Sequence, residues 1–132
     1  MSSSPPTYTL YAPEASFRAL APLIAAEYTG VDITVCTDEA ATAAILAQSP
    51  IGKLPLLQRN DDDSNTLLFS SHAIARYIAG LRRDVGLLGN NGNAAAAAAI
   101  DGWMEFCAAQ IELPACVWFY PVAGYMPFVS SA

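Results

Sequence analysis

The sequence predicts an α/β fold in which a small sheet with helices is followed by a purely helical segment. Over residues 1–85, short apolar runs suited to strands alternate with stretches that have the spacing of helices. A proline opens one predicted strand, in Lys53-Leu54-Pro55-Leu56, and a proline there needs a special turn, often with a cis peptide bond. From Asn93 the chain continues with a run of alanines and with helical periodicity.

The first strand and the first helix lie close to the N-terminus. Tyr8–Ala12 is an apolar run typical of a buried strand. Ser16–Tyr28 has apolar side chains at helical spacing, and Gly30 closes this helix. Pro22 disfavours a regular helix around it, because its ring crowds the carbonyl four residues earlier. We therefore expect the regular helix to begin late, near Ala19, or to bend.

The other predicted elements of this first part are separated by polar turns. The acidic turn at residues 60–65 lacks the glycine and the distal glutamate of a calcium loop, so we interpret it as a solvated hairpin turn. The element order becomes strand, helix, strand, helix, strand, strand, helix. In chain order, the predictions are a strand Val31–Cys36, a helix from the cap Thr37-Asp38-Glu39 to Gln48, strands Leu54–Gln58 and Thr66–Phe69, and a helix Ser71–Leu81 capped by Ser71.

The C-terminal third is predicted to be helical and incomplete. Residues 86–92 form a linker rich in glycine and asparagine, and residues 93–132 hold the first helices of a second domain. Asn93 caps the first of these helices, and Pro114 is expected to kink or end it. Large aromatic side chains crowd the tail 118–128, so we expect self-association, partner binding or aggregation there. The apolar face of the first helix comprises Ile100, Trp103, Met104, Cys107, Ala108 and Ile111.

Composition excludes several classes of function. The formal net charge is −6, and phosphate binding needs clustered basic residues, so no direct contact with nucleic acid is predicted. Neither a signal peptide nor a membrane span is predicted, because the alanine-rich stretch is interrupted by Asp101 and Glu105. His72 has no ligating neighbours in the sequence pattern, so no metal site is predicted. The three cysteines lack metal or redox spacing and suit reduced, buried thiols in the cytoplasm: Cys36, Cys107 and Cys116.

Three segments together resemble the thioredoxin-like half of a glutathione transferase. They are the strand Tyr8–Tyr11, the run Ser49–Leu57 with its Leu-Pro step, and the helix Ser71–Ile78. The resemblance implies a thioredoxin-like domain (βαβαββα, residues 1–85) followed by a truncated start of the all-helical glutathione transferase C-terminal domain. It also implies that the residue before the cis-proline and the serine of the third helix hold glutathione. The glutathione-binding residues implied are Lys53, Leu54, Pro55, Ser70 and Ser71, with Ser70 standing where many transferases have an acidic residue.

Several segments of this chain more closely resemble one branch of this superfamily, the gamma subunit of eukaryotic translation elongation factor 1. They include the segments Leu23–Gly30, Gly52–Pro55, Ser71–Tyr77 and Trp103–Ala108. In that family the domain is a scaffold that docks the nucleotide-exchange subunit. The resemblance therefore implies other elongation factor 1 subunits as partners, or an aminoacyl-tRNA synthetase, since synthetase appendages share the tryptophan–proline segment. A homodimer is a further option.

The predicted donor loop favours a non-catalytic role. A working transferase lowers the pKa of the glutathione thiol with a Tyr, Ser or Cys near the first helix. Counted back from Arg18, the serine-type donor position holds Glu14, whose charge repels a thiolate. Ser16 is the weak catalytic candidate that remains, and it is better explained as a helix cap. We therefore predict a scaffold that requires no cofactor, with glutathione as an optional ligand. The alternatives are an unusual glutathione transferase or an appended synthetase domain.

Overall fold

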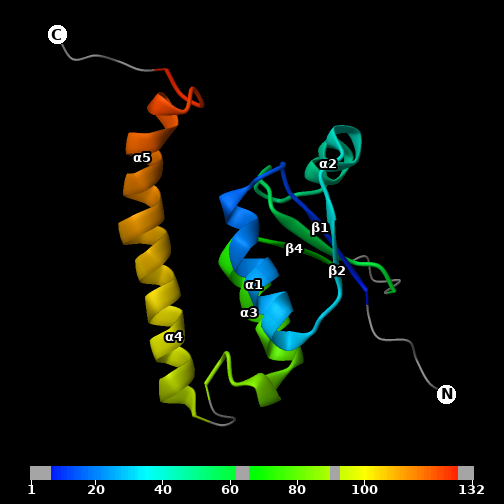
Figure 1. The fold of residues 1–132 in the computed structure, drawn as a ribbon, viewed down its shortest axis with the longest axis vertical. Helices are drawn as coiled ribbons and strands as arrows, with labels where there is room; N and C mark the ends of the chain where they lie inside the picture. The colour runs from blue at the N-terminus through cyan, green and yellow to red at the C-terminus, as the bar shows by residue number, and fades with distance from the viewer. Residues whose placement is uncertain (1–6, 62–65, 90–92, 128–132) are drawn as a thin grey trace. The chain divides into compact units, whose positions relative to one another are not determined.

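The computed structural model describes residues 7–61, 66–89 and 93–127 (Figure 1). The chain divides into two compact units, Met1–Asn91 and Gly92–Ala132, and this division falls within the predicted linker. Each unit is described by itself below. None of the helices in the described ranges is long and apolar enough to cross a membrane.

The N-terminal unit is built on a four-stranded mixed sheet with the strand order β2-β1-β3-β4. Its strands are β1 (Tyr8–Tyr11), β2 (Ile33–Cys36), β3 (Leu56–Arg59) and β4 (Leu67–Phe69). β1 pairs in parallel with β2 and antiparallel with β3, which in turn pairs antiparallel with β4. A parallel pair needs a crossover connection, and the helix between β1 and β2 supplies it.

Most helix boundaries of this unit lie at or near the predicted signals. A 3₁₀ turn, η1 (Phe17–Ala19), leads into α1 (Leu20–Thr29), so the regular helix begins late, as Pro22 predicts. Gly30 ends α1 in the left-handed conformation, with a φ of 66°. The Asp38 carboxylate caps α2 (Glu39–Leu46) by accepting from the Ala41 N–H at 2.8 Å. α3 spans Ser71–Leu81, and a further 3₁₀ turn, η2, spans Arg83–Val85. The predicted βαβαββα order is confirmed.

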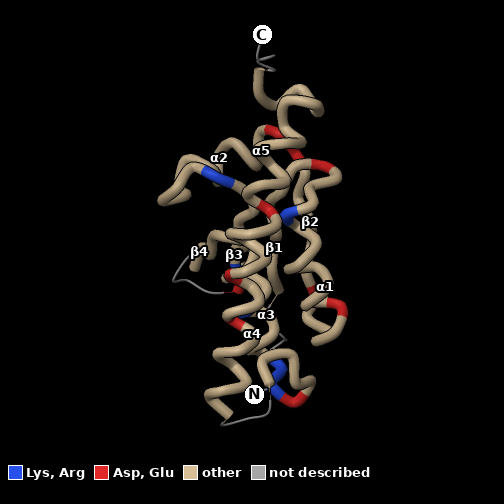
Figure 2. Tube along the Cα trace, turned by 90° about the vertical axis from the view of Figure 1, so that its left-hand side faces the viewer, with Lys and Arg blue, Asp and Glu red and all other residues tan. Residues whose placement is uncertain are grey.

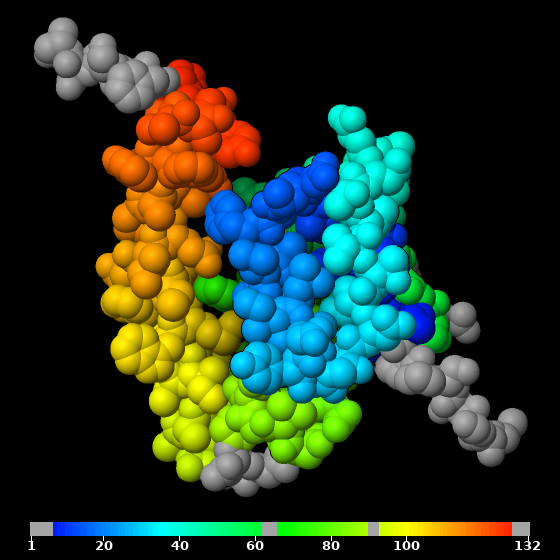
Figure 3. Space-filling model, in the orientation of Figure 1, coloured from blue at the N-terminus to red at the C-terminus, as the bar shows by residue number. Residues whose placement is uncertain are grey.

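The core lies between the sheet and the helices α1 and α3, which run side by side on one face of it (Figure 1). Small residues make the buried side of α1, and this allows its axis to approach α3 closely. Most of the large apolar side chains whose spacing predicted the helix lie at the surface instead, where the open face of α1 is visible (Figure 3). The exposed ones are Phe17, Leu20, Ile24 and Tyr28. Leu23 is half-buried against the core, and the buried residues are Ala19, Pro22, Ala25, Ala26 and Thr29.

The C-terminal unit is one continuous helical rod. It consists of α4 (Ala94–Phe106), a π-helical segment η3 (Cys107–Glu112) and α5 (Leu113–Val122). Asn93 caps α4 as predicted, since its side-chain oxygen accepts from the Ala96 N–H at 3.0 Å. The helix does not end at Pro114. In η3 the hydrogen bonding is of the π type, with the Leu113 N–H donating to the Ala108 carbonyl directly before this proline, and the helix continues past it as α5.

The three cysteines are free thiols, and each is half-buried instead of fully buried as predicted. Cys36 ends β2, whereas the other two lie along the helical rod. Within the described residues, no group of three His, Cys, Asp or Glu side chains is placed to hold a metal ion.

Candidate functional site

The sheet register brings the two predicted halves of the glutathione site together. In the antiparallel β3–β4 pair, Leu56 lies opposite Phe69. Pro55 directly precedes β3 and Ser70 directly follows β4, so both lie at the same end of this strand pair. The Leu54–Pro55 peptide bond is cis, as predicted. Pro55 is buried and Leu54 half-buried, while Lys53 is exposed in the loop before them.

The N-terminus of α3 differs from the prediction. Ser70, not Ser71, occupies the N-cap position, and its carbonyl accepts from the Ile74 N–H at 2.9 Å. Ser70 has a φ of 72° and a ψ of 124°, a rare conformation for a residue with a side chain. Ser71 is the first helical residue, and its hydroxyl donates to the backbone carbonyl of Arg18 at 2.6 Å. The prediction that Ser71 caps the helix is therefore wrong.

The hydrogen bond from Ser71 and the β3–β4 register together bring three distant segments of the chain to one place. It joins α3 to the η1 turn, while the register places Pro55 beside Ser70. The resulting edge carries backbone groups next to the cis-proline and the amide groups of the first turn of α3. These amides, with the positive end of the helix dipole, favour a carboxylate ligand. The arrangement is suited to an extended, peptide-like acid.

The loop between β1 and η1 forms the third side of the site. Ala12 directly follows β1 and donates its N–H to the Cys36 carbonyl at 3.2 Å. Ala15 has a φ of 55°, which favours glycine, and it is the second non-glycine residue of the site with this strain. Ser16 lies at the N-cap of η1, where its carbonyl accepts from the Ala19 N–H at 3.0 Å. Its hydroxyl makes no capping bond to the described turn, and Glu14 is exposed.

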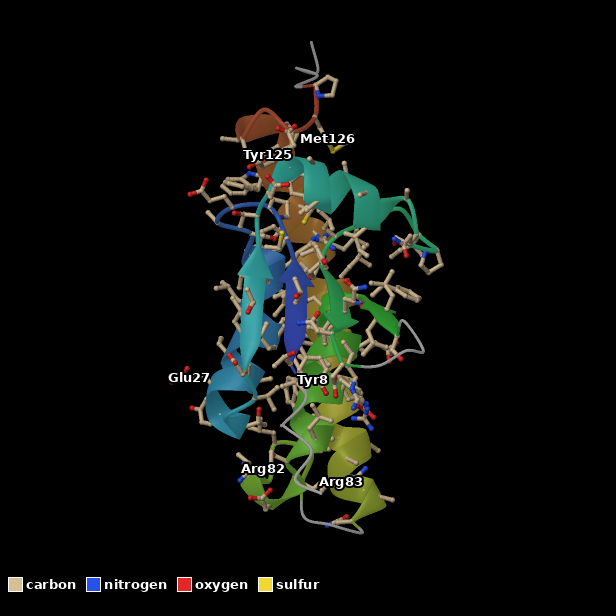
Figure 4. All side chains as sticks on the ribbon, turned by 90° about the vertical axis from the view of Figure 1, so that its right-hand side faces the viewer. Tyr8, Glu27, Arg82, Arg83, Tyr125 and Met126 are labelled. Atoms are coloured by element: carbon tan, nitrogen blue, oxygen red, sulfur yellow. The ribbon has the colours of Figure 1, made fainter. Side chains whose placement is uncertain are left out.

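The tyrosines near the first strand are engaged inside the fold. Tyr8 is buried at the start of β1 (Figure 4), and its hydroxyl lies 3.2 Å from the hydroxyl of Tyr77. Burial, reinforced by this hydrogen bond, raises the pKa of Tyr8 far above its ordinary value. The Tyr11 hydroxyl donates to the Gln58 side chain at 2.9 Å. Both hydroxyls are therefore engaged within the N-terminal unit.

A family comparison settles what this architecture belongs to. The model of the glutathione S-transferase N-terminal domain matches residues 6–80. The chain belongs to the glutathione S-transferase N-terminal domain family. Among solved structures, glutathione transferase F2 from Populus trichocarpa has the same fold, with a TM-score of 0.71 and 24% identity over 94% of this chain and 60% of that one.

One further solved structure and one curated protein are similar to this chain. Glutathione S-transferase I bound with lactoylglutathione is 30% identical, with a TM-score of 0.63 over 81% of this chain and 50% of that one. A curated relative from Arabidopsis thaliana, named probable elongation factor 1-gamma 1, is 37% identical over 83% of this chain. This chain spans only 26% of that relative's length. The resemblance to elongation factor 1-gamma proteins therefore holds for most of this chain and for about a quarter of theirs.

The backbone parts of the predicted site lie at one edge of the sheet, and the Ser71 hydroxyl is engaged within the fold. Leu54, Pro55, Ser70 and Ser71 meet at one edge, whereas Lys53 is exposed beside them. Sequence reasoning missed the Arg18 carbonyl as the acceptor for Ser71. It also missed the strained backbone at Ala15, since nothing in an alanine signals a positive φ.

Proposed function

We propose that this chain is a non-catalytic scaffold of the elongation factor 1-gamma type, which assembles with the nucleotide-exchange subunit of elongation factor 1 in the cytoplasm. The named relatives support this type of protein. The non-catalytic part of the proposal rests on the hydrogen bonds that hydroxyl groups near the site make within the protein. Ser71 donates to Arg18 and Tyr11 donates to Gln58, so neither is directed to a ligand thiol.

The remaining donor position supports the same proposal. A transferase needs a group that stabilises the glutathione thiolate. In this chain the loop after β1 presents the exposed carboxylate of Glu14, and a negative charge there raises the pKa of a nearby thiol. Ser16 is half-buried at the start of η1 and is the one hydroxyl of this loop. Without a second group to orient it, Ser16 supplies little stabilisation of a thiolate.

Glutathione remains a candidate ligand because the backbone half of the site is present. The cis-proline edge pairs with a peptide-like ligand, and the first turn of α3 favours its carboxylate. The position that would bind the ligand's amino group is the uncharged Ser70. A lost charge pair of this kind costs about 2 kcal/mol or more, so we expect glutathione to bind about 30-fold or more weakly than a site that keeps the pair, with a Kd of tens of micromolar or above where that site has about 1 µM.

Two measurements on the full chain test the proposal. The first is calorimetric titration with the nucleotide-exchange subunit of elongation factor 1, for which we expect a one-to-one complex with a Kd of about 1 µM or tighter. The second is turnover of glutathione with a chlorodinitrobenzene-type electrophile, for which we expect no rate above that of the uncatalysed reaction. Low-micromolar glutathione binding with turnover lost on Ser16→Ala would identify a transferase instead. Binding to an aminoacyl-tRNA synthetase alone would support the appended-domain alternative.

A further inference from the structure

The strand β2 forms one edge of the four-stranded sheet (Figure 1). It pairs with β1 on one side, and among the residues that the structure describes no strand pairs with its other side. β1 separates this edge from β3, the strand that follows the cis-proline of the candidate site. An unpaired edge presents a row of backbone N–H and C=O groups, with which another chain can pair.

The hydrogen bonding between β1 and β2 identifies which backbone groups of β2 point outward. The Ala12 N–H donates to the Cys36 carbonyl at 3.2 Å, so Cys36 bonds toward β1. In a parallel pair, the residues that bond to the neighbouring strand do so with both N–H and C=O, and they alternate along the strand. Thr34 therefore also bonds to β1. Ile33 and Val35 direct their N–H and C=O groups to the free side, which offers four backbone groups to an added strand.

Three features that commonly protect an exposed edge are absent from β2. Its four residues include no lysine and no proline, and its register with β1 is continuous, without a bulge. Thr34 and Val35 are both exposed, Val35 by 42%. Their side chains are β-branched, which suits them to a pleated surface with a further strand beside it. The edge is therefore able to accept an extended segment.

Charge indicates what kind of segment this edge fits. Between Arg18 and Lys53 the sequence has four acidic residues and no basic residue, and Figure 2 marks the acidic residues of this stretch in red. Arg82 approaches the stretch through the Thr29 carbonyl at 3.4 Å, but its guanidinium is paired with Asp84. The four acidic residues are all exposed, and two of them precede β2 and two follow it: Glu27, Asp32, Asp38 and Glu39.

The same charges disfavour a second copy of this chain as the occupant of the edge. Antiparallel pairing of two β2 strands about a twofold axis would place Asp32 of one copy near Asp38 and Glu39 of the other. Like charges opposite each other across a strand pair destabilise it. Lysine or arginine on an incoming segment would instead be attracted to these carboxylates. Charge therefore selects a basic segment of a different protein.

We propose that the β2 edge is a docking site for an extended, positively charged segment of another protein, which adds to the sheet as a further strand. Antiparallel addition is expected, since antiparallel pairs are slightly more stable per residue than parallel ones. Backbone bonds to Ile33 and Val35 supply the affinity. Basic side chains beside Asp32 and Glu39 supply the preference for a positively charged sequence. The proposal does not depend on whether glutathione binds.

Amide hydrogen exchange, followed by NMR on the full chain, tests the pairing directly. The probe is a synthetic peptide of about nine residues in which lysine alternates with valine and threonine, and we expect a Kd of about 0.1 mM because the edge is short. With the peptide at about ten times its Kd, the amides of Ile33 and Val35 should exchange about tenfold more slowly. This slowing should exceed that at Thr34 and Cys36, which are already bonded to β1.

Two altered peptides separate backbone pairing from simple attraction between charges. Methylation of the central backbone nitrogens keeps the lysines and removes the N–H donors, so the Kd should rise at least about tenfold. Replacement of the lysines by glutamates keeps the backbone and reverses the charge, and the Kd should again rise at least about tenfold. Equal affinity for the methylated peptide and its parent would overturn the proposal, because attraction to the carboxylates would then need no strand.

Variants of the protein place the binding on β2. The Val35 N–H points away from β1, so Val35→Pro removes no bond of the existing sheet, and proline is tolerated on an edge strand. Its peptide Kd should rise at least about tenfold, whereas the control Val35→Thr keeps the N–H and should change the Kd less than about threefold. The double variant Asp32→Asn with Glu39→Gln leaves the backbone edge intact and should raise the Kd at least about threefold at low salt.

Several results would overturn the proposal. They are unchanged peptide affinity in the double variant, unchanged affinity in a folded Val35→Pro chain, and slowed exchange at other amides with none at Ile33 and Val35. A dimer that forms without peptide and dissociates in Val35→Pro would assign the edge to a second copy of the chain and would overturn it as well.

Discussion

The hydroxyl of Ser71 offers the sharpest test of how this site is used. We interpret it as a structural donor that fixes the start of α3 to the η1 turn, through its 2.6 Å bond to the Arg18 carbonyl. The prediction is that Ser71→Ala destabilises the N-terminal unit, whether or not glutathione is present. If the hydroxyl instead served a ligand, its loss would change binding and leave stability nearly unchanged.

The magnitude follows from the geometry. The bond is short and half-buried, so its net contribution is about 1 kcal/mol, and leaving a carbonyl without its donor adds about 1 kcal/mol more. Alanine has the higher helix propensity, which returns a few tenths of a kcal/mol at this first helical position. We therefore expect a loss of about 1.5 kcal/mol. In a unit of this size that corresponds to a fall in Tm of about 6–12 °C.

Both tryptophans lie after residue 92, so their fluorescence does not report on this unit. Urea unfolding followed by far-UV circular dichroism, with hydrogen exchange at the β1 and β3 amides, measures it directly. Ser71→Thr keeps the donor and should lose less than about 0.5 kcal/mol. Ser16→Ala is the matched serine control, because the Ser16 side chain makes no capping bond within the described η1 turn. Equal stability of Ser71→Ala and Ser16→Ala would refute this interpretation of Ser71.

Three further predictions concern the core, the strained loop and pH. Ile78→Ala opens a cavity at a fully buried position of α3, so urea unfolding should show a loss of about 2–5 kcal/mol, whereas an unchanged midpoint would contradict the assigned core. Ala15→Gly relieves a φ of 55°, and thermal unfolding should show a gain of up to about 1 kcal/mol. The same change at Ala43, inside α2, should cost about 1 kcal/mol, and a loss at both positions would exclude strain at Ala15. The raised pKa of Tyr8 means that the unfolded chain releases this proton at lower pH than the folded one. Stability measured from pH 8 to 12 should therefore be constant below about pH 9 and fall above about pH 10, with a smaller fall in Tyr8→Phe.

The order of the elements was predictable because each boundary carries a local signal. Gly30 adopts the left-handed conformation that ends α1, and the side chains of Asp38 and Asn93 cap the helices that follow them. These effects involve neighbouring residues alone, so the sequence contains them fully. Pro114 is the exception. The helix continues past this proline because the hydrogen bonding just before it changes to the π type in η3. This change involves residues over more than one turn, and no single residue signals it.

The buried face of α1 was not predictable from periodicity. The large residues Leu20, Ile24 and Tyr28 follow the helical repeat and yet lie at the surface. Ala25 and Ala26 lie in the core, because two helices that cross closely over a short sheet have room for small side chains only. The spacing of apolar residues identifies a helix and its apolar face. The distance to the neighbouring helix or sheet decides which face is buried.

The backbone conformation at the site was also not predictable from the sequence. Ala15 and Ser70 both adopt a positive φ that their side chains disfavour, at a cost of about 1–3 kcal/mol each. Such conformations persist only where the surroundings impose them. Here the β3–β4 register and the Ser71 bond to Arg18 hold the chain on the two sides of Ser70, and the Ala12 bond to Cys36 and the same Arg18 bond hold it on the two sides of Ala15. The strained backbone at this edge of the sheet is thus maintained by the packing of the fold itself. Under the proposed function, the backbone half of the site follows from folding alone, and the identity of the donor groups, Glu14 and Ser16, decides against catalysis.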